Sequence, residues 1–157
     1  MDKDLPTSGQ LERDISQKIQ KLYRQQLEHS PQKVICQLFD NKLAIVIEDA
    51  LTEVEKKLAK INENNDTAQK LNAVINQSIK SKLEILVEEI LNVEVEDILF
   101  DSTFKSNQTG AIITLNRPPV VRNPSSIPKN KRIVREKSKH PNKVNSSKIG
   151  RDRNQNS

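Results

Sequence analysis

Apolar residues recur at helical spacing in two long stretches of this chain, and each stretch leads into segments with strand composition. The first stretch runs from Gly9 to His29 and the second from Asp66 or Thr67 to about Asn92. Their apolar positions are Leu11, Ile15, Ile19, Leu22 and Leu27 in the first, and Leu71, Val74, Ile75, Ile79, Leu83, Leu86 and Ile90 in the second. Spacing of three to four residues predicts two amphipathic helices, and each must bury its apolar stripe against another layer.

Two hairpins follow these helices. Residues 33 to 48 predict the first, with its turn at Asp40-Asn41 and a second strand that is apolar on both faces and therefore central in a sheet. Residues 93 to 104 alternate between apolar and acidic side chains, which is typical of a half-buried strand. We expect a turn at residues 106 to 110, a strand at 111 to 115, and an end to the hairpin at Pro118-Pro119.

A short helix is predicted between the hairpin and the second long helix. Thr52 and Glu55 have the spacing of a capping box, and Val54, Leu58 and Ile61 follow at helical spacing. The order α-β-β-α-α-β-β favours a two-layer α+β fold, with helices packed on a four-stranded antiparallel sheet. Three further apolar residues, Ile85, Val87 and Leu91, widen the stripe of the second long helix. We therefore expect the helix at 67 to 92 to contact a second copy of the chain, as a homo-oligomer.

The charge of the chain divides at residue 117. Residues 118 to 157 hold eleven basic and two acidic side chains, a balance of +9, whereas residues 1 to 117 hold 15 basic and 19 acidic ones, a balance of −4. Five of the seven prolines and few aliphatic residues fall in this basic segment. We interpret the chain as a flexible N-terminus at 1–8, an α+β domain at 9–117 and a basic disordered tail at 118–157.

Several classes of protein are disfavoured by composition. The longest aliphatic run is the five residues from Leu43 to Ile47, too short to cross a bilayer, and the polar N-terminus is unlike a signal peptide. A single cysteine favours a reducing, cytoplasmic setting. Three glycines are too few for a nucleotide-binding loop, and no Ser-His-Asp or Cys-His arrangement stands out. We expect a non-enzymatic protein without catalytic residues, cofactor or metal.

Three features with chemical potential have simpler interpretations. Cys36 lies in a predicted strand and is expected to be a small buried residue rather than a nucleophile. His29 is expected to be a solvated residue at a helix end. Carboxylates gather between residues 84 and 97 without the spacing of a calcium loop, which favours a solvated acidic face. They are Glu84, Glu88, Glu89, Glu94, Glu96 and Asp97.

The basic segment is the candidate partner-binding region. Its charge is concentrated in two clusters, made of Lys129, Lys131, Arg132, Arg135, Lys137 and Lys139. Three acidic partners fit: an anionic membrane surface, nucleic acid held through its phosphates, and the acidic body of the protein itself. The segment lacks Phe, Tyr and Trp, which disfavours sequence-specific recognition of single strands.

Four stretches of the body resemble the MpsC-like family, named for a component of a sodium-translocating, membrane-potential-generating system. They are Gly9-Gln10-Leu11-Glu12 with Ile15; Ser30-Pro31-Gln32-Lys33-Val34; Leu51-Thr52-Glu53-Val54-Glu55-Lys56-Lys57-Leu58-Ala59; and Asn92-Val93-Glu94-Val95 through Thr109-Gly110 and Leu115. Ser30 stands where the family often has glycine. The resemblance covers residues 9 to 117, carries no catalytic signature, and implies a small protein linked to ion translocation.

These observations together predict an accessory or adaptor protein of a membrane ion-translocating system. It would be cytoplasmic, with peripheral attachment at the inner face of the membrane and a protein partner there. The alternative is a nucleic-acid-associated protein that binds phosphates nonspecifically through its basic tail.

Overall fold

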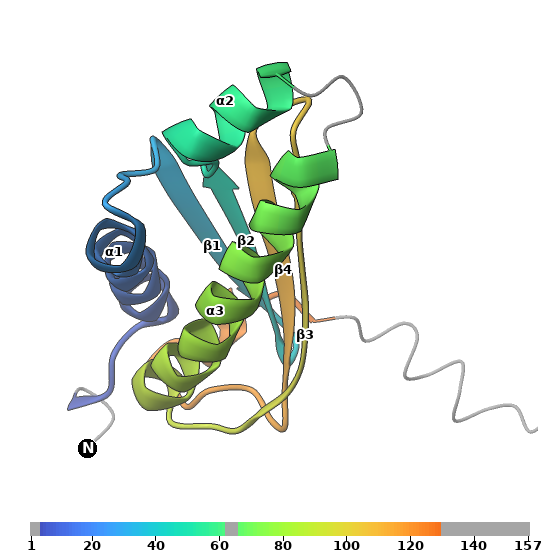
Figure 1. The fold of residues 1–157 in the computed structure, drawn as a ribbon. Helices are drawn as coiled ribbons and strands as arrows, with labels where there is room; N and C mark the ends of the chain where they lie inside the picture. The colour runs from blue at the N-terminus through green and yellow to red at the C-terminus, as the bar shows by residue number, and fades with distance from the viewer. Residues whose placement is uncertain (1–3, 62–65, 130–157) are drawn as a thin grey trace, which may run out of the picture.

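The computed structural model describes residues 4–61 and 66–129, which form helices packed on one face of a four-stranded antiparallel sheet (Figure 1). The elements in chain order are α1 (Ser8–Leu27), β1 (Lys33–Phe39), β2 (Lys42–Glu48), α2 (Glu53–Ile61), α3 (Asp66–Leu91), β3 (Val95–Thr103), β4 (Gln108–Leu115) and the short 3-10 helix η2 (Pro124–Ser126). The strands lie in the order β1-β2-β4-β3, so β2 is central. The predicted fold class, element order and central second strand are confirmed.

Local signals account for most of the boundaries. Thr7 and Gln10 form a capping box at the start of α1, and Glu28 ends it in the left-handed region with a φ of 51°. The turn between β1 and β2 is Asp40-Asn41 as predicted, with Asp40 at a φ of 49°. The second turn is shorter than predicted, because Gln108, Thr109 and Gly110 already pair within β4. Asn107 supplies the positive φ for that turn, at 54°, so Gly110 is not needed there.

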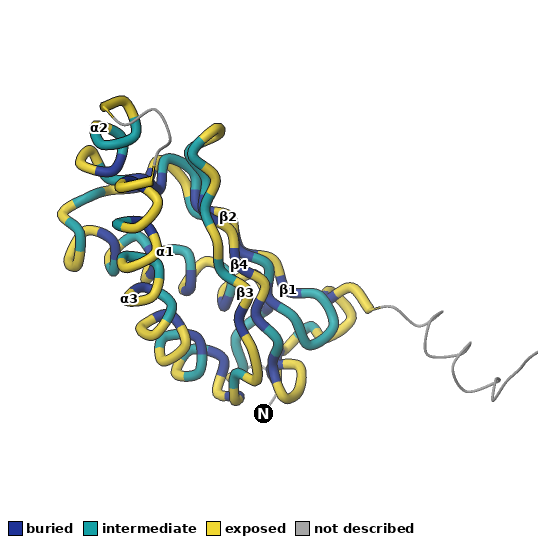
Figure 2. The backbone as a smooth tube through the Cα atoms, turned by 45° about the vertical axis from the view of Figure 1, so that its right-hand side comes forward, coloured by how far each residue is buried: buried dark blue, intermediate teal, exposed yellow. Residues whose placement is uncertain are grey.

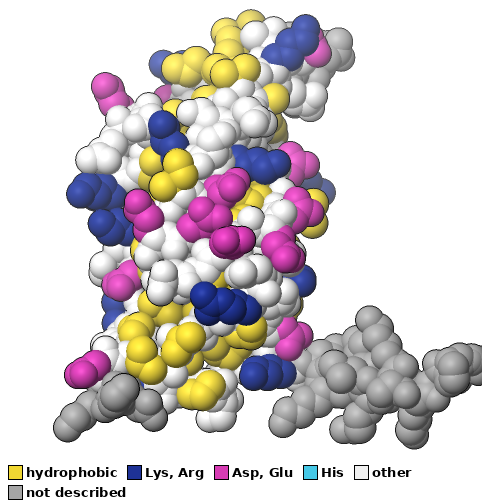
Figure 3. All heavy atoms as spheres, turned by 90° about the horizontal axis from the view of Figure 1, so that it is seen from below, with side chains coloured by type: hydrophobic (Ala, Val, Ile, Leu, Met, Phe, Trp, Pro, Cys, Tyr) yellow, Lys and Arg dark blue, Asp and Glu magenta, His cyan; other side chains and the backbone are white. Residues whose placement is uncertain are grey.

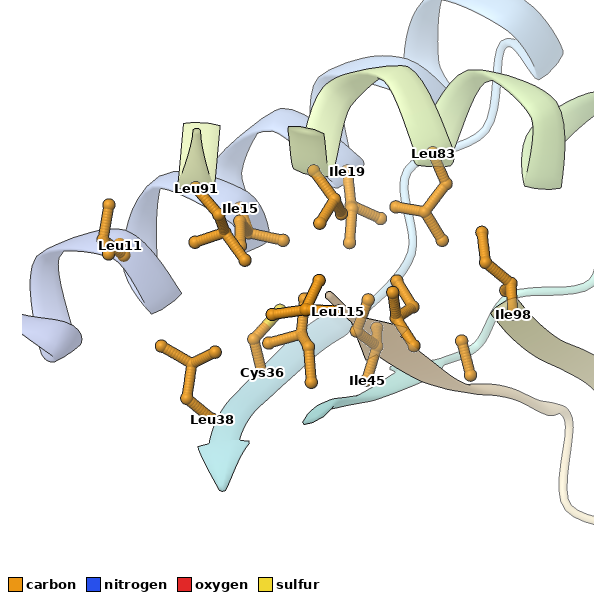
Figure 4. Close-up of a cluster of buried hydrophobic side chains, with 14 of the residues drawn as sticks. Leu11, Ile15, Ile19, Cys36, Leu38, Ile45, Leu83, Leu91, Ile98 and Leu115 are labelled. Atoms are coloured by element: carbon orange, nitrogen blue, oxygen red, sulfur yellow. The ribbon is translucent and has the colours of Figure 1, made fainter. Parts of the chain in front are cut away.

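The core lies between the sheet and the two long helices (Figure 4). Helix α1 packs on the β1 side and α3 on the β3 side, and the two helices also pack against each other. Side chains at alternate strand positions face them, which makes one face of the sheet apolar and buried. The core includes Leu11, Ile15, Ile19, Cys36, Leu38, Ile45, Leu83, Leu91, Ile98 and Leu115.

Most of the residues that widen the apolar stripe of α3 are buried inside this one chain. Val87 and Leu91 are buried in the core, whereas Ile85 is 58% exposed. Helix α3 contacts α1, α2 and β3, so it has several partners inside one molecule. The homo-oligomer contact through this helix stays a prediction. The exposed apolar residues of α3 that could form it are Ile85 and Val74.

The packed part of the chain extends to residue 129 and does not end at 117, where the sequence places the start of the tail. Val121 and Ile127 are buried in the core, and the amide of Asp40 donates to the carbonyl of Pro128 at 2.7 Å. The aliphatic residues of this segment, although few, fill gaps that the domain leaves open. Residues 130 to 157 lie outside the described part of the chain.

The N-terminal segment is also packed where the structure describes it. Thr7 caps α1, Ser8 is buried, and the carbonyl of Pro6 accepts from the amide of Arg122 at 2.9 Å. Residues 6 to 8, which the sequence analysis places in a flexible N-terminus at 1–8, are thus packed against the rest of the chain. The reason is that Pro6 pairs with a segment far along the chain, a contact with no local signal.

Candidate functional site: a polar cavity between α3 and β3

A cavity of about 520 Å³ lies between one face of α3 and the strand β3. Its lining is mostly polar, with amides from the helix and a hydroxyl from the strand, and two phenylalanines at the strand side. The side chains that shape it include Gln69, Asn72, Asn76, Lys80, Ser102 and Phe104. A cavity lined by amides and hydroxyls suits a small ligand that both donates and accepts hydrogen bonds.

A continuous chain of hydrogen bonds forms the floor of this cavity. The Nδ2 of Asn76 donates to the Oδ1 of Asn72 at 3.0 Å and to the Oγ of Ser102 at 2.9 Å. The Nδ2 of Asn72 also reaches the Oγ of Ser102 at 3.3 Å, and that oxygen lies 2.7 Å from the Oγ1 of Thr109. Helix α3 and strands β3 and β4 are thereby joined through side chains.

Glu55 is the buried carboxylate at the end of this chain of hydrogen bonds. Only 1% of the residue is exposed, and its Oε2 accepts from the Nδ2 of Asn72 at 2.7 Å. Its Oε1 accepts from the amide and the hydroxyl of Thr52 at 2.8 and 2.9 Å. Within residues 4–61 and 66–129, no basic side chain forms an ion pair with it. The carboxylate is held by hydrogen bonds in place of a counter-charge.

Tyr23 brings α1 to the same polar cluster. Its ring is 1% exposed, and its hydroxyl has no hydrogen-bond partner of good geometry among the described residues. Burial raises the pKa of Tyr23 far above its usual value, the negative charge of Glu55 raises it further, and the side chain of Thr109 opposes the rise. The hydroxyl therefore stays protonated throughout the physiological range.

The hydrogen bonds of Ser102 engage its whole hydroxyl group. The Oγ of Ser102 accepts from the amides of both Asn72 and Asn76, which occupies its two lone pairs. Its own proton is then directed to Thr109. In this arrangement the hydroxyl of Ser102 is a hydrogen-bonded part of the cavity wall.

Sequence reasoning missed most of this site. The capping box at Thr52 and Glu55 is present as predicted, since each side chain bonds the backbone amide of the other. Val54 and Ile61, however, are exposed at 58% and 79%, so they do not form a buried stripe on α2. Asn72 was the available signal, because it is a polar residue between the apolar positions of a long helix.

The predicted partner-binding residues lie mostly beyond the described part of the chain. Lys129 is exposed and follows Pro128, whose carbonyl is bonded to the β1-β2 turn. The remaining five, Lys131, Arg132, Arg135, Lys137 and Lys139, fall outside the described residues. The last described residue, Lys129, therefore lies beside the turn between β1 and β2.

The two single-residue interpretations have different outcomes. Cys36 is buried in the core as predicted, and burial raises the pKa of its thiol to about 11, although a contact from Ser16 opposes the rise. A protonated thiol is a poor nucleophile. His29 is only partly exposed, and its Nε2 lies 2.7 Å from the carbonyl oxygen of Asp49, so it links α1 to the end of β2 rather than being fully solvated.

The predicted acidic face lies at the end of the molecule where α3 stops and β3 begins. Figure 3, which views the molecule from that end, shows acidic side chains gathered with hydrophobic atoms exposed nearby. The exposed members are Glu84, Glu89, Glu94, Glu96 and Asp97, and Glu88 is half-buried because its Oε2 accepts from the amide of Val95 at 2.9 Å. In the two described ranges, no three His, Cys, Asp or Glu side chains come together as a metal site would require. No helix among those residues is long and apolar enough to span a membrane.

Comparison with protein families assigns the domain. The family model described as Na+-translocating membrane potential-generating system (MpsC) matches residues 7–117. The chain belongs to the MpsC family. The match spans α1 through β4 and hence every residue that lines the polar cavity. No curated protein and no solved structure matches the chain. Residues 118–129 pack on the MpsC domain but lie beyond the family match.

Proposed function

We propose that this MpsC-family protein is a non-enzymatic accessory or adaptor subunit of a sodium-translocating, membrane-potential-generating system. The observation that carries the proposal is the family match over residues 7–117. Two side chains support the non-enzymatic part: Ser102 in the cavity has both lone pairs engaged, and Cys36 in the core has a raised thiol pKa.

Peripheral attachment through the basic segment is the second part of the proposal. Lys129, the first residue of the two basic clusters, is exposed and follows Pro128, whose carbonyl accepts from the amide of Asp40 in the β1-β2 turn. Each basic residue held close to an anionic membrane contributes about 1 kcal/mol, and the two clusters contain six. We infer reversible, salt-sensitive association at the inner face of the membrane together with a protein partner.

The test is nuclease-treated cell fractionation combined with crosslinking and mass spectrometry. The full chain is compared with a variant in which Lys129, Lys131, Arg132, Arg135, Lys137 and Lys139 are all replaced by Gln. A matched control replaces six exposed lysines of the domain, Lys18, Lys21, Lys57, Lys60, Lys82 and Lys105. We expect recovery with membranes and crosslinks to a transport subunit, weakened by the first set and kept by the control. A full chain that crosslinks to no membrane subunit would contradict the proposal.

The alternative is nonspecific binding of nucleic acid, favoured by the +9 charge of residues 118–157. Such binding releases counterions, so its affinity must fall steeply as salt rises. Recovery only before nuclease treatment, lost on neutralising the six tail residues, would favour this function over the adaptor function. Binding that is insensitive to salt would rule it out.

A further inference from the structure

The outer face of the sheet is not covered by any helix of the described chain. Helices α1 and α3 lie on the opposite side (Figure 2), and several outward positions of the strands carry large apolar side chains. Leu99 is 67% exposed, Ile35 is 40% exposed, and Val46 and Ile112 are each 37% exposed. Four large apolar side chains on one open sheet face form a surface that favours contact with another protein.

This face has a protruding side chain, Leu99, beside a shallow depression. Ala44 and Gly110 carry little or no side chain, and they help to line a shallow depression of about 300 Å³ beside Leu99. Leu99 pairs with Ile112 across the sheet, and Ile112 pairs in turn with Ala44. A large residue on β3 and a small one on β2 thus flank β4 in a single row.

The adjacent row carries opposite charges at the same two strands. Asp97 on β3 and Lys42 on β2 both pair with Thr114 of β4. Asp97 is exposed and Lys42 is partly exposed, and both occupy outward positions because their neighbours Ile98 and Leu43 are buried in the core. In this row, one side of β4 is acidic and the other is basic.

We propose that this open sheet face binds a second copy of the chain, as a symmetric dimer. A two-fold axis parallel to the strands and passing over β4 exchanges β2 of one copy with β3 of the other. Leu99 then lies over the partner's Ala44, Asp97 meets the partner's Lys42, and Ile112 meets its own counterpart on the axis. Each contact occurs twice, as an isologous interface requires.

The interface is small, so we expect the dimer to form only at high protein concentration. With the axis over β4, only β2, β4 and β3 of each copy overlap. Strand spacing and rise give these three strands a plan area of roughly 300 Å², low for a stable complex. Asp101 also lies on this face, paired with Gly110, and must lose some of its hydration. We expect dissociation in the micromolar range or weaker.

Sedimentation velocity of the full chain over a range of concentrations tests the dimer. We expect a monomer–dimer equilibrium that Leu99→Glu shifts to monomer, while circular dichroism shows that the variant is folded. Lys42→Asp and Asp97→Lys should each weaken dimerisation about tenfold, because each places like charges together. The double variant, which restores opposite charges, should recover it. Ile85→Asp, on the exposed side of α3, is the control and should leave the dimer intact.

Three results would overturn the proposal. One is a monomer at every concentration, including a monomer whose sheet face is covered by residues 130–157 or by another protein. The second is dissociation by Ile85→Asp with no effect of Leu99→Glu, which would place the contact on α3. The third is a charge-reversed double variant that dimerises no better than either single variant.

Discussion

At the scale of single residues, the buried carboxylate of Glu55 joins α2 to α3 through its hydrogen bonds. It is buried, caps α2 through Thr52 and holds Asn72 of α3. Glu55→Ala leaves buried donors without an acceptor, so we expect the free energy of unfolding to fall by about 2–3 kcal/mol. Urea denaturation measures the change. The exposed neighbour Glu53, which pairs with Lys56 on the surface, is the control, and a loss at Glu53→Ala as large as at Glu55→Ala would contradict this account.

Cys36 gives the fold a dependence on alkaline pH. Burial raises the pKa of its thiol from 9.0 to about 11, so the folded chain holds this proton more tightly than the unfolded chain. Its contribution to stability is complete below pH 9 and is lost as pH rises through 11, a fall of about 2 kcal/mol. Unfolding measured from pH 8 to 11 should therefore decline more steeply for the natural chain than for Cys36→Ala. Parallel curves would show that the thiol titrates normally in the folded chain.

At the scale of elements, α3 joins the core and the polar cavity on different parts of its surface. Ile79 is 1% exposed in the core, and Ile85 is 58% exposed on the same helix. Ile79→Asp places an unpaired charge among apolar side chains, and we expect it to cost more than about 3 kcal/mol. Ile85→Asp should change stability by less than about 0.5 kcal/mol. Thermal melting followed by circular dichroism compares them, and equal melting temperatures would mean that the helix faces are wrongly assigned.

The elements were largely predictable because their signals are local. Periodicity marks both long helices and both hairpins, and Thr52 with Glu55 marks the start of α2. The site was not predictable, because it depends on which distant side chains meet. Glu55 accepts a hydrogen bond from Asn72, and Ser102 accepts one from Asn76. These pairs lie 17 and 26 residues apart in sequence. No spacing rule joins such residues before the fold is known.

At the scale of the whole molecule, the packed domain includes residues 118–129. Val121 and Ile127 are buried, and backbone bonds tie this segment to Pro6 and Asp40. A chain truncated at 117 loses both side chains from the core, and we expect it to lose about 3–5 kcal/mol of stability. A chain truncated at 129 should match the full chain, because every described core residue remains. Denaturation midpoints compare the three, and equal stability of 1–117 and 1–129 would contradict the extended domain.

Composition alone predicts a longer tail because residues 118–129 resemble the rest of the basic segment. Residues 118–129 are rich in proline and poor in apolar residues, yet Val121 and Ile127 enter a core that the domain has already built. A segment needs little apolar surface of its own when it completes an existing core. The remaining basic clusters still separate the chain into an acidic domain and a strongly basic end.

The proposed role of the protein is to serve a sodium-translocating, membrane-potential-generating system without catalysing a reaction. The most direct measurement is the sodium-dependent membrane potential of cells lacking this chain, complemented with the full chain or with the variant neutralised at Lys129, Lys131, Arg132, Arg135, Lys137 and Lys139. The account predicts a reduced potential without the chain, restoration by the full chain, and weaker restoration by the variant. A sodium-dependent potential that is unchanged by removing the chain would contradict the account.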